Sequence, residues 1–334
     1  MRQSALSLLL VLCLGLVWGL KTTAALAQNA PAPGPAQLDL SKYDLPANFE
    51  QLPPQEKILI IVRQEAEKGN PAAMLEMGNY YEQGRVVRRD FTEALEWYLK
   101  AAKKDLPAAY YNVGMSYLVG QGDAPNVSKA LDNLRLASLR GFPAADFQLA
   151  IFYFRGLHVK ANVPEALKYL NKAADAGLVV AINEKGVIEY NGLWNQKVNK
   201  TSAFNNFAKA AEAGYGEAMR NLGVCYLNGE GQTKNNVQAL KWFSLARDVG
   251  FKPQEMDQVA TTLKLELNPS EIAQADVEAK AWLEAARSKA QAINYAQTVG
   301  QANAAANAPQ PAKAAEPPKA APKPAAKPKP KGRR

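Results

Sequence analysis

The sequence predicts an all-α protein: a right-handed α/α superhelical solenoid of five helix-turn-helix repeats, with capping helices at both ends. Two observations carry this prediction. Alanines and glycines recur about every 36 residues through the middle of the chain, and an Asp or Asn recurs shortly before each second helix. Such a period indicates one supersecondary unit stacked repeatedly, because each unit can bury its apolar face only against its neighbours.

The recurring small residues fall in registers that suit a pair of helices. Glycines at one register are expected to end the first helices with a positive φ angle. Alanines seven residues apart lie on one face of the second helix, and small residues in the first helix let the two helices approach closely. The sets are Ala73, Ala109, Ala145, Ala181 and Ala218; Gly84, Gly120, Gly156, Gly192 and Gly229; Ala94, Ala130, Ala166, Ala203 and Ala239; Ala101, Ala137, Ala173, Ala210 and Ala246; and Gly78, Gly114, Ala150, Gly186 and Gly223.

A polar residue stands four positions before the first alanine of every second helix. Asp and Asn are good N-caps, because their side chains accept hydrogen bonds from the free N–H groups of the first turn. We therefore expect second helices to begin near residues 91, 127, 163, 200 and 236. The predicted caps are Asp90, Asn126, Asn162, Asn199 and Asn235.

These signals set the expected boundaries of the solenoid. The five repeats are expected at 72–107, 108–143, 144–179, 180–216 and 217–252, after a capping helix at 54–71 and before capping helices at 253–300. In the last of these, Asn268 is expected to cap a helix with Glu271 reaching back to it. The fourth repeat departs from the others, because Lys185 and Glu189 replace an apolar residue and a tyrosine, and "LWNQKVNK" holds one extra residue.

The two ends of the chain are expected to lie outside the solenoid. Residues 1–27 hold a short basic start, an apolar run and a small-residue cleavage site, which is typical of a secretory signal peptide. Residues 28–53 are expected to form a flexible leader. Residues 301–334 consist almost entirely of Ala, Pro, Lys and Asn, so we expect a disordered basic tail. Export to the periplasm follows; the alternatives are secretion, or retention in the inner membrane by an uncleaved signal.

The charge of the chain is concentrated at its ends. The whole chain carries a net charge of +9, and the tail alone, with six lysines, two arginines and one glutamate, carries +7. The solenoid region is therefore close to neutral, and no specific binding of nucleic acid is expected. The tail is compatible with contact to an anionic polymer or lipid, or with a role as a solubilising spacer.

The repeats resemble a known family. The stretches "AAMLEMGNYYEQGRVVRRDFTEALEWYLKAAKKD" and "EAMRNLGVCYLNGEGQTKNNVQALKWFSLARDVG" are similar to Sel1-like repeats, which are relatives of tetratricopeptide repeats. The shared pattern covers about 180 residues in five units. The resemblance implies an α-solenoid whose first helices line a concave face, and a role as an adaptor that binds proteins.

The search for catalytic chemistry finds little. His158 is the only histidine, it lies in a loop, and the chain has no metal-ligand, P-loop or nucleophile-elbow motif. Cys225 is the only cysteine outside the predicted signal, and we expect it to be a small buried residue. No enzyme activity, cofactor or metal is therefore expected.

A groove is expected where the first helices meet. Apolar side chains in the second and third repeats are predicted to form one patch that binds a protein or peptide, unless curvature of the solenoid or the leader covers it. The predicted groove residues are Tyr111, Met115, Leu118, Phe147, Ile151, Phe154, Tyr190 and Arg220.

The leading functional hypothesis is a non-catalytic scaffold or adaptor of the bacterial cell envelope that binds a protein or peptide in this groove. One alternative is an enzyme or enzyme-like binder of cell-wall material. Some secreted members of the family were described as β-lactamase-like, but they carry a cysteine pair in each repeat, which this chain lacks. A further alternative is that the basic tail tethers the solenoid to an anionic envelope polymer or membrane surface.

Overall fold

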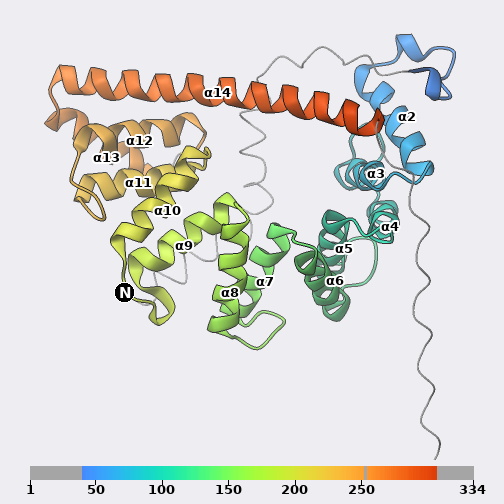
Figure 1. The fold of residues 1–334 in the computed structure, drawn as a ribbon, viewed down its shortest axis with the longest axis horizontal. Coiled ribbons are helices and arrows are strands. Elements are labelled where there is room, and N and C mark those ends of the chain that lie inside the picture. Colours follow the sequence, from blue (N-terminus) through green and yellow to red (C-terminus); the bar gives the residue numbers. More distant parts are fainter. Residues whose placement is uncertain (1–39, 252–253, 307–334) are drawn as a thin grey trace, which may run out of the picture.

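The computed structural model describes residues 40–251 and 254–306, which form an arc of stacked helical hairpins (Figure 1). This part of the chain contains no strand. The residues predicted to form the signal peptide, and those of the tail beyond residue 306, lie outside the described residues. The α-helices are α2 (Pro54–Glu67), α3 (Pro71–Gln83), α4 (Phe91–Ala102), α5 (Pro107–Val119), α6 (Val127–Leu139), α7 (Pro143–Arg155), α8 (Val163–Asp175), α9 (Val179–Asn191), α10 (Lys200–Glu212), α11 (Gly216–Asn228), α12 (Asn236–Asp248), α13 (Gln254–Glu266) and α14 (Pro269–Ala306).

The five hairpins are α3–α4, α5–α6, α7–α8, α9–α10 and α11–α12, and their caps confirm the predicted pattern. Each predicted Asp or Asn accepts a hydrogen bond from a backbone N–H in the first turn of its second helix. Each first helix ends at a glycine in the left-handed conformation, with φ between 65° and 75°. Every first helix begins one residue earlier than expected, at 71, 107, 143, 179 and 216.

The loop after each first helix has a second left-handed position that the sequence did not reveal. It lies two residues after the terminal glycine, and it is glycine in only two of the five hairpins. The lone histidine occupies this position in the third hairpin, where it is exposed and lies edge-on to the ring of Phe152 with the ring centroids 5.4 Å apart. The five residues are Val86, Gly122, His158, Trp194 and Gly231.

Within each hairpin a small residue of the first helix lies against a large residue of the second. A Cβ atom added to Gly78 would stand 2.3 Å from the ring of Tyr98, and one added to Gly223 would stand 2.8 Å from the ring of Phe243. These distances are far below van der Waals contact, so the glycines are required for the close packing of the two helices. The predicted role of the small residues is therefore confirmed.

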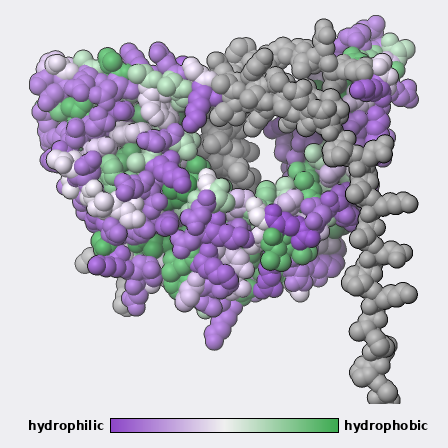
Figure 2. Space-filling view, in the orientation of Figure 1, coloured by the Kyte–Doolittle hydropathy of each residue, from purple (hydrophilic) through white to green (hydrophobic). Residues whose placement is uncertain are grey.

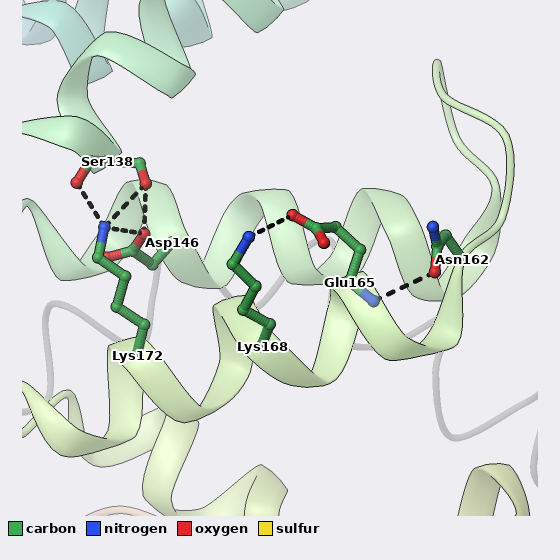
Figure 3. A network of polar contacts seen from close by, with 6 residues as sticks. All are labelled: Ser138, Asp146, Asn162, Glu165, Lys168 and Lys172. Atoms are coloured by element: carbon green, nitrogen blue, oxygen red, sulfur yellow. Dashed lines mark hydrogen bonds and ion pairs between the residues drawn. The ribbon is translucent and has the colours of Figure 1, made fainter.

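One joint between hairpins is polar. Asp146 of α7 is 1% exposed; it accepts a hydrogen bond from Ser138 Oγ of α6 at 2.5 Å and pairs with Lys172 Nζ of α8 at 2.9 Å (Figure 3). Lys172 also donates to the backbone oxygen of Ser138 at 2.5 Å. At the other joints an alanine and a large apolar residue hold these positions. Those pairs are Ala66 and Met74, Ala102 and Tyr110, Ala174 and Ile182, and Ala211 and Met219.

The end of the leader differs from the prediction of a flexible segment over 28–53. Residues 40–53 include two 3-10 helices, η1 (Leu40–Lys42) and η2 (Phe49–Gln51), and they lie on α2. Gln64 of α2 binds both the backbone N–H and the backbone oxygen of Asp44, and Phe49 is buried. The described part of the leader therefore extends the N-terminal cap, and the hydrogen bonds of Gln64 join it to α2.

The C-terminal cap is built on α12. Trp282 of α14 packs edge-on against Trp242, and Glu278 accepts a hydrogen bond from Gln238 at 2.7 Å. Asn268 caps α14 and Glu271 reaches back to its N–H at 2.9 Å, as predicted. The helix continues to Ala306, beyond the predicted boundary at 300, and Figure 1 shows it extending across the open side of the arc.

Candidate functional site

The candidate site is the surface formed by the first helices α3, α5, α7, α9 and α11, here called the first-helix face. Side chains on this face reach from one hairpin to the next: Asn221 Nδ2 of α11 donates to Asn183 Oδ1 of α9 at 3.0 Å. Arg220 in turn donates to Asn221 Oδ1 at 2.7 Å. Figure 2 shows a largely hydrophilic surface with smaller hydrophobic areas along the arc, which encloses a hollow.

The apolar residues predicted for the groove are divided between two parts of the core. Tyr111, Met115 and Leu118 pack against a cluster centred on α6 and α7, whereas Ile151 and Phe154 pack against the cluster that continues to α14. All five side chains are partly exposed. They therefore contribute partly exposed apolar area to the first-helix face. That they bind a partner stays a prediction.

Phe147 requires a correction. Its side chain is 4% exposed, so it is a core residue rather than part of an open groove. Phe147 belongs to the buried cluster that continues through the later hairpins to α14, so contacts with neighbouring helices account for its burial. Tyr111 is also strongly enclosed: it packs against Phe142 with ring centroids 5.3 Å apart, and burial raises the pKa of its hydroxyl.

Two of the predicted groove residues, Tyr190 and Arg220, make side-chain hydrogen bonds within the chain. Tyr190 donates a hydrogen bond to Glu230, and Lys200 Nζ lies 3.2 Å from the centre of the Tyr190 ring while pairing with Glu230 at 3.1 Å. The bond from Tyr190 is the main cause of a lowered pKa at Glu230. Tyr190 thus ties two hairpins together, and Arg220 is partly exposed beside Asn221.

Glu184, on the first-helix face, has a carboxyl group with a strongly raised pKa. Its side chain is partly exposed but enclosed by α7, α9 and α11, and burial raises its pKa to about 8. Glu217 of α11 raises the pKa further, and Arg155 of α7 opposes both effects. Glu217 also accepts a hydrogen bond from the hydroxyl of Tyr215 at 3.0 Å.

The raised pKa of Glu184 predicts a dependence of stability on pH. Between about pH 4.5 and pH 8 the folded protein keeps a proton at Glu184 that the unfolded chain releases, so this group makes stability fall as pH rises through that window. Glu184→Gln should remove this effect, because glutamine does not titrate. The third hairpin already has a glutamine, Gln148, at the same register.

We expect the free energy of unfolding of the variant to equal that of the wild type near pH 4.5. At pH 8 it should be higher than that of the wild type by at least about 1.4 kcal/mol, the value of one pKa unit. Urea unfolding at both pH values measures this; equal stability at pH 8 would contradict it.

One polar register of this face was missed by the groove prediction, although the sequence carries a signal for it. The register one position after the predicted groove register is polar in all five hairpins. It consists of Glu76, Asn112, Gln148, Glu184 and Asn221. The Nδ2 atom of neighbouring Asn183 is buried without a hydrogen-bond partner, which is costly in a protein interior.

The described residues show no group of three or more His, Cys, Asp or Glu side chains placed to hold a metal ion. In the same part of the chain, no helix is both long and apolar enough to cross a membrane. Cys225 is buried, and burial raises the pKa of its thiol to about 12. A thiol with so high a pKa is a poor nucleophile.

The fold is an α-solenoid of five stacked helical hairpins, with the first-helix face along one side. The model of the Sel1 repeat matches residues 71–106, 107–142, 143–178, 181–215 and 216–251, which together make up more than half of the chain. The chain belongs to the Sel1 repeat family. None of the curated proteins compared with the chain matches it.

Two solved structures are similar in fold and sequence. A Sel1 repeat protein from Oxalobacter formigenes is 27% identical with a TM-score of 0.59, over 62% of this chain and 59% of that one. The protein c5321, a protective antigen present in uropathogenic Escherichia coli strains, is 26% identical with a TM-score of 0.58, over 81% of this chain and 57% of that one. The chain therefore spans less than two thirds of the length of each.

Membership of the family carries a general function. Sel1 repeat proteins generally mediate protein–protein interactions, and the repeat is in general a non-catalytic fold.

Proposed function

We propose that this protein is a non-catalytic scaffold that binds a protein or peptide on its first-helix face. The observation that carries the proposal is the composition of this face in the last two hairpins. Glu184, Glu217 and Arg220 are partly exposed there, beside the partly buried apolar side chains of the same helices, and they adjoin the buried Asn183 and Asn221.

This combination suits a peptide better than a small apolar ligand. The guanidinium group of Arg220 can donate hydrogen bonds to the carbonyl oxygens of a peptide, and the carboxyl groups of Glu184 and Glu217 can accept them from its N–H groups. The charged residues provide positions for a partner's charges, and the apolar side chains provide contact area. An interface of this kind combines an apolar centre with a polar rim.

The proposal is tested by adding bulk and charge to the face without entering the core. Val187 and Val224 hold one register of α9 and α11 and are partly exposed. We expect Val187→Arg with Val224→Arg to reduce capture of the partner by the full chain at least tenfold, in quantitative mass spectrometry of co-purified proteins. Leu139→Arg is the matched control, because Leu139 is 78% exposed at the end of second helix α6. Unchanged capture by the double variant, with circular dichroism unaltered, would contradict the proposal.

We also propose that the protein acts in the cell envelope, and that the basic tail increases its concentration near anionic surfaces. The support is the signal-like sequence at 1–27 and the net charge of +7 over 301–334. The similar antigen from uropathogenic Escherichia coli is a protective antigen, which is compatible with this location.

Deleting residues 301–334 should abolish salt-dependent binding of the protein to anionic vesicles while leaving partner capture intact. Vesicle binding that survives the deletion would contradict a role for the tail.

A further inference from the structure

The fourth hairpin contains a cavity that the departures of its sequence create. The cavity measures about 610 Å³ and lies between α8, α9 and the loop before α10. Two of its lining residues, Lys185 and Glu189, are the residues that break the repeat pattern. A cavity of this size is within the range of small-molecule and peptide side-chain sites.

A tyrosine fills the corresponding space in the fifth hairpin. Tyr226 of α11 packs edge-on against Phe204, which belongs to the second helix of the preceding hairpin, with ring centroids 5.3 Å apart. In the fourth hairpin Glu189 replaces the tyrosine, and Leu167 of α8 holds the register of Phe204. Leu167 lines the cavity, so the space lies where an intramolecular tyrosine would otherwise pack.

The loop of the fourth hairpin keeps this space open. In the second and fifth hairpins Gly122 and Gly231 lie directly on the preceding second helix, where an added Cβ would come within 2.3 Å and 2.1 Å of a backbone oxygen. Trp194 holds that register in the fourth hairpin, and its indole stacks on Phe154 with ring centroids 5.0 Å apart. An indole cannot fit where the glycines do, so residues 196–199 border the cavity instead of closing it.

The lining combines apolar walls with two lysines and one glutamate, which together carry a net charge of +1. Leu167, Leu170, Ile188 and Val198 form apolar surface, and Val198 is 50% exposed. Within the part of the chain that the structure describes, Lys185 and Lys197 are paired with no carboxylate. Glu189 is held by Asn206, whose Nδ2 donates to it at 2.8 Å, and Asn171 and Asn199 add further polar groups.

We propose that this cavity receives a tyrosine-like aromatic side chain, flanked by acidic residues, from a partner peptide. The aromatic ring would pack on Leu167 as Tyr226 packs on Phe204, and its hydroxyl would meet the polar groups of the lining. Lys185 and Lys197 would face the acidic residues on either side. The inference rests on the proposed role in protein binding and specifies a second contact, at the edge of the repeat stack.

The test uses the full chain and three synthetic probes: acetyl-Glu-Tyr-Glu amide, acetyl-Glu-Ala-Glu amide and acetyl-Lys-Tyr-Lys amide. Binding is followed by ligand-observed NMR titration. We expect the first probe to bind at least tenfold more tightly than either of the others. Equal binding of the three probes, or no binding of the first at millimolar concentration, would overturn the proposal.

A cavity-filling variant makes the test specific. Glu189→Tyr places the chain's own tyrosine where four other hairpins have one, so it should keep the fold and lose at least tenfold in affinity for the first probe. Glu96→Tyr, on an exposed position of α4, is the matched control and should bind as the wild type does. Wild-type affinity in a folded Glu189→Tyr protein would overturn the proposal.

Lys185→Leu separates charge from shape, because Leu149 and Leu222 hold the same register in other hairpins. It should reduce the preference for glutamate over lysine in the probe at least threefold; an unchanged preference would overturn the assigned role of Lys185. The probes and these variants do not involve Val187 or Val224. Failure of the cavity test with retained sensitivity of partner capture to those two positions would therefore reject this inference and leave the proposed function standing.

Discussion

Asp146→Ala is expected to destabilise the protein by about 3 kcal/mol, one of the largest effects of any single substitution in the solenoid. Asp146 is almost fully buried and is bound by Ser138 and Lys172. Removing it leaves the buried Ser138 hydroxyl without its acceptor and Lys172 without its counter-ion. The side chain of Lys172 is 45% exposed and can turn to water, which keeps the cost near the lower end of that for a broken buried pair.

A double variant separates the polar contacts from the packing. Ser138→Ala with Asp146→Met reproduces the Ala211 and Met219 pair of another joint, so it should lose less than about 1 kcal/mol relative to the wild type. Urea unfolding followed by far-UV circular dichroism measures all three proteins. A single variant as stable as the wild type, or a double variant less stable than the single one, would show that the polar joint does not act as described.

Gly78→Ala is expected to destabilise the first hairpin by about 2–3 kcal/mol. The added methyl group would overlap the ring of Tyr98, which is 1% exposed. The ring cannot move freely, because its hydroxyl donates to Glu82 at 2.7 Å and lies 3.0 Å from Asn79 Oδ1. Alanine has the higher helix propensity, so the loss observed is smaller than the steric cost alone.

The chain supplies its own rescue for this change. The third hairpin pairs Ala150 with Leu170 where the first pairs Gly78 with Tyr98. In a Tyr98→Leu background, Gly78→Ala should therefore cost nothing or be slightly stabilising. The double-mutant cycle should give an interaction energy of about 2 kcal/mol, measured by thermal unfolding. Additive effects of the two substitutions would contradict the direct contact between them.

The regular parts of the fold were predictable because they depend on local chemistry. Asp90 and its counterparts cap helices through contacts within three residues, and Gly84 and its counterparts end helices through their own φ angle. Phe147 could not be placed in the same way. Its burial depends on neighbouring helices of the cluster that continues to α14, which the register along α7 alone does not report.

The candidate site was predictable only in outline. The first-helix register identified Arg220 and the partly exposed apolar side chains. The raised pKa of Glu184, however, comes mainly from burial by neighbouring helices, with smaller effects from Glu217, which raises it, and Arg155, which lowers it. The irregular fourth hairpin shows the same limit. Lys185 and Glu189 stand out in the sequence as departures, but the cavity they create depends on the path of the adjoining loop.

The central claim is that the first-helix face is the surface that meets a partner. A photo-crosslinking amino acid placed at Val187 or at Leu139 tests it most directly, in cells that produce the full chain. The account predicts a defined adduct from Val187, and none from Leu139, which is 78% exposed on a second helix. An adduct of equal yield from Leu139, or adducts from second-helix positions alone, would contradict it.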